Sequence, residues 1–185
     1  MKFDFNYLAT FLSLFYGLAI MHALTCISSY IQNYKKITDY WVWWIWAIYL
    51  IIGSCAMWMG IFNRWSNIVI WENYYTLYLT IHSSLIYISF SIFFNSFNLL
   101  ENTNLKSQYY KSKKAFFIFF GLALFMKVFG QIVILNGSLF KEMFSIIQCT
   151  VFISLAFINR RKMHATLSVF SLLLLLLSIF NKLLK

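Results

Sequence analysis

The chain has 185 residues, of which 62% are hydrophobic, 22% are aromatic and only 11% are charged, with a formal net charge of +10. A soluble domain carries about a quarter charged residues, because water must solvate its surface. This composition therefore excludes an ordinary soluble protein. A membrane-spanning helix needs roughly 20 apolar residues to cross about 30 Å of hydrocarbon. The length leaves room for about six spans, and it predicts an all-α, polytopic transmembrane helical bundle.

Six apolar segments follow one another and form a single transmembrane domain over residues 1–185. The first segment is too long for a cleavable signal peptide and lacks a small-residue cleavage site. The second opens with tryptophans, whose indole rings favour the headgroup boundary, so we expect a membrane interface there. Residues 99–114 are expected to form a polar, basic loop. The expected spans are residues 5–31, 40–62, 68–97, 115–135, 139–158 and 165–184.

Lysines and arginines are distributed unevenly between the two predicted sides of the membrane. Five lie on the side of the two termini, at Lys2, Arg64, Lys141, Lys182 and Lys185. Cytoplasmic loops carry an excess of basic residues, so both termini are expected outside the cytoplasm. The orientation of the protein in the membrane explains the basic loops better than contacts with nucleic-acid phosphates do. No nucleic-acid partner is therefore expected. The loops after segments one, three and five carry nine, namely Lys35, Lys36, Lys106, Lys111, Lys113, Lys114, Arg160, Arg161 and Lys162.

Lys127 lies well inside the fourth segment, where an ionisable side chain costs a few kcal/mol and needs a partner. Gln131 follows at i+4 on the same helical face. Glu142 near the start of segment five and Glu72 near the start of segment three approach from the same side. We therefore expect a Lys127–Glu142 or Lys127–Glu72 pair. Such a group either fixes helix register or lines a polar cavity that opens outward for an ion, a proton or an anionic substrate.

The third segment carries a polar stripe at spacings of three and four residues, which places its members on one helical face. A stripe of this length either lines a water-filled path or hydrogen-bonds neighbouring helices. Its hydroxyls can also bond carbonyls of their own helix. With Lys127, Gln131 and Glu142, the stripe forms a candidate polar cavity between segments three, four and five. The stripe residues are Glu72, Thr76, Thr80, Ser83, Tyr87, Ser91 and Asn95.

His22 and His82 lie in the first and third segments, which run in the same direction across the membrane. Paired intramembrane histidines suggest haem or metal ligation, although hydrogen-bonded core histidines are the more common arrangement. No zinc-protease motif, catalytic triad or phosphate-binding loop is present. The three cysteines fall in apolar segments and predict no disulfide. The sequence therefore indicates neither catalytic residues nor a metal site, and no cofactor is expected.

Two ridges of small residues favour close helix packing. They predict that segments one and two pack tightly together, or that one of them forms a contact between subunits. The chain has no proline and only six glycines, so few positions allow the broken helices that are typical of carriers. The ridge residues are Ala9, Ser13 and Gly17 in the first segment and Gly53, Ala56 and Gly60 in the second.

Residues 14–22 (LFYGLAIMH) and 40–46 (YWVWWIW), followed by Trp58, are the most distinctive part of the sequence. They resemble the Gly-Leu-Ala-Ile first span and the Trp-rich second span of small, uncharacterised bacterial polytopic membrane proteins. The resemblance covers the first third of the chain. It implies a location in the bacterial inner membrane and supplies no activity.

Three classes of function are compatible with this sequence. The first is a subunit or scaffold of a membrane assembly, working as a homo-oligomer or with a partner membrane subunit. The second is a small channel or transporter that uses the candidate polar cavity. The third, a haem-binding membrane protein, rests on His22 and His82 alone. Because the loops are short, the protein is expected to act within the lipid bilayer or through a partner.

Overall fold

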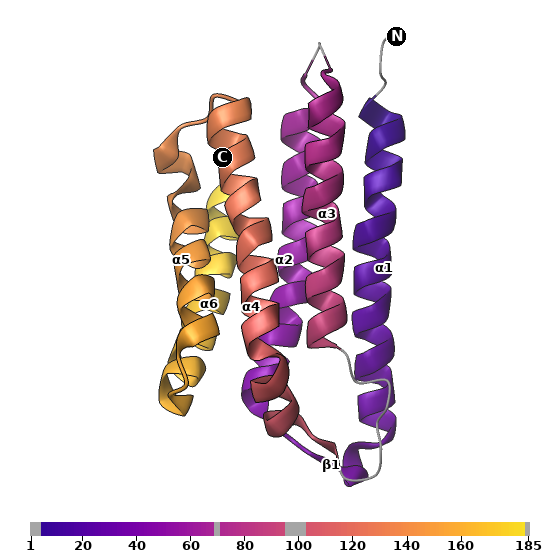
Figure 1. Cartoon of the computed structure of the whole chain (residues 1–185), viewed down its shortest axis with the longest axis vertical. Helices are drawn as coiled ribbons and strands as arrows, with labels where there is room; N and C mark the ends of the chain where they lie inside the picture. Colours follow the sequence, from indigo (N-terminus) through magenta and orange to yellow (C-terminus); the bar gives the residue numbers. More distant parts are fainter. Residues whose placement is uncertain (1–4, 69–70, 95–102, 184–185) are drawn as a thin grey trace.

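The computed structural model describes residues 5–68, 71–94 and 103–183, and these contain six long helices (Figure 1). Each of the six is long and apolar enough to cross a membrane, which confirms the predicted all-α bundle. A π-helical turn over Gly130–Ile134 extends the fourth helix, and a 3-10 turn over Leu139–Glu142 precedes the fifth. The helices are α1 (Phe5–Gln32), α2 (Trp41–Trp65), α3 (Asn73–Phe93), α4 (Leu105–Phe129), α5 (Met143–Phe157) and α6 (Arg161–Leu183).

The fourth helix begins at Leu105, whereas the sequence pattern placed its start at residue 115. Much of the predicted loop over residues 99–114 is therefore helical. The Asn104 side chain caps the helix, because its Oδ1 accepts hydrogen bonds from the backbone amides of Lys106 at 3.0 Å and Ser107 at 3.2 Å. The first turns of α4 are polar, and a search for apolar runs cannot recognise them as helix.

Helices α2 and α6 lie behind a row formed by α1, α3, α4 and α5 (Figure 1). Within the bundle, α3 packs between α1 and α4, and α2 packs against both α1 and α6. Both terminal helices have their chain ends toward the same end of the bundle. At the other end, strands β1 (Ile37–Thr38) and β2 (Thr103–Asn104) form a short parallel pair.

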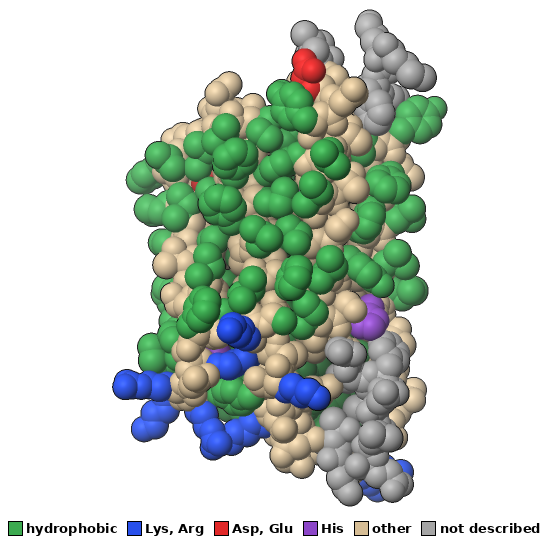
Figure 2. Space-filling model, viewed as in Figure 1, with side chains coloured by type: hydrophobic (Ala, Val, Ile, Leu, Met, Phe, Trp, Pro, Cys, Tyr) green, Lys and Arg blue, Asp and Glu red, His purple; other side chains and the backbone are tan. Residues whose placement is uncertain are grey.

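Basic side chains gather at the end of the bundle that carries β1 and β2. Figure 2 shows Lys and Arg side chains there, below a broad hydrophobic surface. We call this end of the bundle the basic end. It contains the C-terminal ends of α1, α3 and α5 and the parts of the following connections that the structure describes. The distribution matches the charge asymmetry that the sequence predicts between the two sides of the bundle.

Aromatic rings fill the core between α2, α4 and α5. The Trp46 ring is fully buried, with its centroid 5.1 Å from that of Phe117 and 5.0 Å from that of Phe152. These edge-to-face contacts suit the ring quadrupoles. Trp43 is also buried, whereas Trp41 is 52% exposed. Trp43 and Trp46 thus pack inside the bundle, and of the three only Trp41 has the exposure expected of an indole at a headgroup boundary.

Helices α1 and α2 pack against each other, but the glycines Gly17 and Gly60 of the small-residue ridges lie outside close contacts between helices. Gly17 is exposed, and a Cβ placed there would meet no atom of a neighbouring helix within 4 Å. Gly60 is half-buried, and a Cβ placed there would likewise meet no atom within 4 Å. A Cβ at Gly53 would lie 3.6 Å from Leu175 of α6. The ridge on α2 therefore faces α6, where it leaves open space.

Candidate functional site

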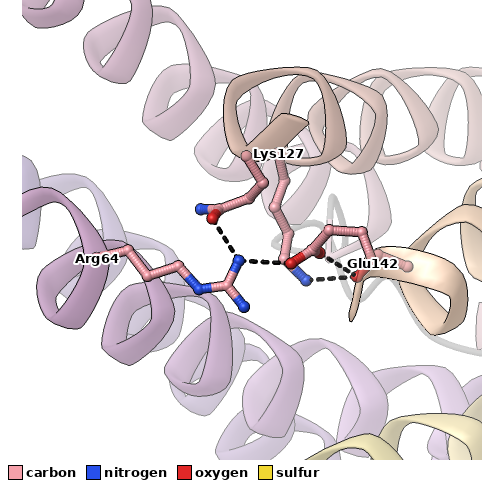
Figure 3. A network of polar contacts seen from close by, with 5 residues as sticks. Arg64, Lys127 and Glu142 are labelled. Atoms are coloured by element: carbon pink, nitrogen blue, oxygen red, sulfur yellow. Dashed lines mark hydrogen bonds and ion pairs between the residues drawn. The ribbon is translucent and has the colours of Figure 1, made fainter. Parts of the chain in front are cut away.

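A cluster of charged and polar side chains lies between α2, α4 and α5, away from the basic end (Figure 3). Arg64 Nη1 forms an ion pair with Glu142 Oε1 and also donates to Gln131 Oε1. Lys127 Nζ donates to Ser145 Oγ at 2.9 Å, and Ser145 Oγ donates to Glu142 Oε2 at 3.2 Å. Both oxygens of the Glu142 carboxylate therefore accept hydrogen bonds. We call these five residues the Glu142 cluster.

Glu142 is the most enclosed charge of the Glu142 cluster. Its side chain is 4% exposed, whereas that of Arg64 is 34% exposed. Moving a carboxylate out of water costs several kcal/mol unless it is paired and hydrogen-bonded. Arg64 and Ser145 meet that requirement. Two cations, Arg64 and Lys127, thus share one carboxylate, so the cluster is net positive.

The π-helical turn after α4 shapes this cluster. The backbone N–H of Leu135 donates to the carbonyl of Gly130, five residues back, at 3.0 Å. The Tyr78 hydroxyl of α3 donates to the Met126 carbonyl just before the turn. A Cβ at Gly130 would lie 2.6 Å from the Tyr78 oxygen, so only glycine allows this approach without a shift. Single π turns of this kind are frequent at functional sites, and this one carries the buried Gln131.

A cavity of about 200 Å³ adjoins the cluster between α2, α4, α5 and α6. Its wall is mostly apolar, and Lys127 is the charged residue on it. Met59, on the rim, is 61% exposed, so the cavity opens sideways out of the bundle. We call it the α2–α6 cavity. Its lining includes the polar side chains of Asn63, Lys127, Gln148 and Ser178 beside apolar residues such as Met57 and Leu175.

The structure brings together three of the predicted cavity residues, Lys127, Gln131 and Glu142, and leaves Glu72 apart. Glu72 is exposed just before α3 begins. Lys127 reaches Glu142 through the Ser145 hydroxyl. Arg64, which the sequence placed in the tight connection after the second segment, forms an ion pair with Glu142 as well. Helix α2 continues through that connection to Trp65, and this extension carries Arg64 to the cluster.

The residues of the polar stripe on α3 do not line the α2–α6 cavity. Thr80 Oγ1 donates to the carbonyl of Thr76 in its own helix at 2.8 Å, and both residues are half-buried. Ser83 is fully buried, and Asn95 lies outside the described residues. The void among α2, α3 and α4 that touches Lys127 measures only about 10 Å³, no more than one water molecule occupies. A polar cavity was expected between the third, fourth and fifth segments. The α2–α6 cavity instead lies on the other side of Lys127.

The two histidines singled out from the sequence lie on neighbouring helices. His82 is fully buried, and its Nδ1 lies 3.4 Å from the Tyr16 hydroxyl of α1. His22 is half-buried on α1. His82 lines the void of about 10 Å³, which has no room for a haem macrocycle. Among the described residues, no group of three or more His, Cys, Asp or Glu side chains could hold a metal ion.

A second polar cluster, around His164 at the basic end, was missed by sequence reasoning. His164 is fully buried, with Nδ1 2.8 Å from the Tyr109 hydroxyl and Nε2 2.8 Å from the Ile158 carbonyl. Lys113 Nζ donates to the same carbonyl and to Asn159 Oδ1, the latter at 2.8 Å. The predicted spans left Lys113 and His164 in loops. Because α4 and α6 begin earlier than expected, both side chains are enclosed by helices.

Comparison with known proteins identifies no relative of this chain. No family model matches the sequence, no curated protein is significantly similar to it, and no solved structure matches its fold.

Proposed function

We propose that this protein is a membrane protein that binds an anionic amphiphile, such as a fatty acid, in the α2–α6 cavity. The observation that carries the proposal is the ammonium group of Lys127 on the wall of a mostly apolar cavity. Lys127 belongs to a cluster in which two cations share one carboxylate. A bound anion would balance that charge, and an apolar chain would fill the rest of the cavity.

The size of the cavity limits which part of the ligand it encloses. Pockets that enclose drug-sized molecules measure about 300–1,000 Å³. The α2–α6 cavity is smaller, at about 200 Å³, and opens to the side. It therefore suits the charged end and first carbons of a molecule whose remainder lies in the surrounding lipid. Lipid tails are as apolar as the cavity wall, so the contact with Lys127 must supply most of the selectivity.

We further propose that the basic end faces the cytoplasm and that both termini face the other side. The α2–α6 cavity would then open into the outer leaflet, since the Glu142 cluster lies away from the basic end. A bacterial inner membrane is the proposed location, on the strength of the resemblance in the first third of the chain.

Binding of cis-parinaric acid, a fluorescent fatty acid, to the purified protein in neutral-lipid nanodiscs tests the proposal. Lys127→Met should weaken binding of the acid by about 10- to 100-fold, the usual loss for a hydrogen bond to a charged group. The neutral methyl ester should bind both proteins alike. Lys141→Met removes an exposed lysine from the 3-10 turn before α5 and should change neither affinity.

Equal affinity of the acid for the wild-type protein and Lys127→Met would overturn the proposal. The subunit or scaffold function expected from the sequence would then be the better account. Proteins that co-purify with the chain in mild detergent would identify the assembly.

A further inference from the structure

A second cavity lies at the basic end, where the start of α4 meets the connection from α5 to α6. It measures about 580 Å³ and shares no residue with the α2–α6 cavity. We call it the basic pocket. It is lined by Asn104, Lys106, Ser107, Tyr110, Asn159 and Arg161.

The charges around the basic pocket are positive. Lys106 and Arg161 lie on its wall, and the Lys113 ammonium lies directly behind it. Lys113 is only 7% exposed, so solvent screens its charge poorly. Asp39 is the acidic residue that the structure describes at this end, and it does not line the pocket. Its Oδ1 accepts hydrogen bonds from the Tyr40 backbone amide and from Trp44 Nε1, each at 2.8 Å, so this carboxylate is engaged at the start of α2.

The polar groups left to face the basic pocket are mainly hydrogen-bond donors. Asn104 Oδ1 is occupied by the backbone amides of Lys106 and Ser107. Asn159 Oδ1 accepts from Lys113 Nζ, so the amide N–H groups of Asn159 remain for a ligand. The ammonium, guanidinium, amide and hydroxyl groups together form the donor set that phosphate oxygens accept from.

We infer that the basic pocket binds the phosphate group of an anionic phospholipid headgroup or of a soluble phosphate ester. The two sources share the same phosphate chemistry. The position of the pocket at one end of the apolar helices favours the lipid source, because basic pockets between helices on the cytoplasmic side attract anionic headgroups. The inference does not depend on the α2–α6 cavity, since the two sites lie at opposite ends of the bundle.

Thermal unfolding of the purified full-length chain in non-ionic detergent tests this inference. Phosphatidylglycerol should raise the melting temperature, because a ligand that binds only the folded state stabilises it, and phosphatidylcholine should not. The double variant Lys106→Gln/Arg161→Gln should need at least about tenfold more phosphatidylglycerol for the same shift. The matched control Lys111→Gln/Arg160→Gln removes two exposed basic residues of the same end that do not line the pocket, and it should behave as wild type.

Asn159→Asp provides a second variant that preserves the internal contacts. Its carboxylate still accepts from Lys113 but places a negative charge against the ligand. We expect an unchanged melting temperature without lipid and loss of the phosphatidylglycerol shift.

Inorganic phosphate separates the two ligand sources. A shift by inorganic phosphate, with competition against the lipid, would assign the pocket to a soluble phosphate ester. A shift by phosphatidylglycerol alone would assign it to a lipid headgroup. Two results would overturn the inference and indicate that diffuse surface charge attracts the lipid. One is an equal loss of the phosphatidylglycerol-induced rise in melting temperature in both double variants. The other is a full rise retained by Asn159→Asp.

Discussion

Lys127 Nζ lies 2.9 Å from Ser145 Oγ, a contact that joins α4 to α5 at the wall of the α2–α6 cavity. The Ser145 hydroxyl in turn donates to Glu142, whose other oxygen pairs with Arg64 of α2. One buried carboxylate thus links three helices. Lys127 belongs to this link and also faces the cavity, which gives it both a structural role and the proposed binding role.

Glu142→Gln should destabilise the protein more than Arg64→Gln. The first change leaves two cations without a carboxylate, and breaking a buried pair in this way costs about 3 kcal/mol. The second leaves Lys127 and Ser145 with Glu142, and should cost about 1 kcal/mol because Arg64 is partly solvated. For a chain of this size, 1 kcal/mol corresponds to about 2–4 °C in melting temperature. Thermal unfolding of both variants in one detergent measures the difference, and the reverse order would contradict the charge arrangement.

Gly130→Ala should be destabilising, because its Cβ would lie 2.6 Å from the Tyr78 oxygen. The expected cost is about 1–2 kcal/mol, after the gain in helix propensity is subtracted from the strain. Tyr78→Phe removes that oxygen together with its hydrogen bond to the Met126 carbonyl. The double variant should therefore be more stable than the sum of the two single changes predicts. Strict additivity in a double-mutant cycle would show that the two residues do not crowd one another.

Lys113→Met should cost about 1 kcal/mol or more, because it leaves the half-buried Ile158 carbonyl and Asn159 Oδ1 without their ammonium donor. Lys111→Met, on the exposed face of the same helix, should change stability by less than about 0.5 kcal/mol. Denaturation of the two variants side by side gives the comparison. Equal effects would mean that Lys113 does not hold the α5–α6 connection in place.

The proposed orientation predicts which introduced cysteines are accessible from outside a bacterial cell. In a variant without the three native cysteines, Asn67→Cys should react with a membrane-impermeant maleimide in intact cells. Lys162→Cys, at the basic end, should react only after the membrane is permeabilised. Both positions are exposed, so burial does not limit either reaction. Labelling in the opposite pattern would invert the orientation and place the α2–α6 cavity in the inner leaflet.

The apolar segments were enough to predict six helices, because a run of about 20 apolar residues has few alternatives to a membrane helix. The start of α4 at Leu105 could not be found in this way. Its first turns contain lysines, serine and glutamine, and Asn104 as a capping residue is the signal that would have marked it. Helix ends at a membrane surface are decided by capping and tertiary packing as well as by hydropathy.

The candidate site was predictable in part. Lys127, Gln131 and Glu142 share one end of the bundle because of their positions in consecutive apolar segments, and the structure brings them together. Arg64 was not predictable as the partner of Glu142, since that required knowing that α2 continues past the expected end of its span. The position of the cavity was likewise unpredictable, because hydropathy does not reveal that α2 packs against α6.

The most direct test of the proposed function compares two glycine-to-leucine variants in cis-parinaric acid binding. Gly60 lines the α2–α6 cavity and Gly17 lies exposed on α1, and at both positions an added side chain starts in open space. Both changes carry the same gain in helix propensity, so neither should lower the melting temperature. Gly60→Leu should fill the cavity and abolish saturable binding, whereas Gly17→Leu should bind as the wild-type protein does. Saturable binding by Gly60→Leu with wild-type affinity would contradict the assignment of the ligand to this cavity.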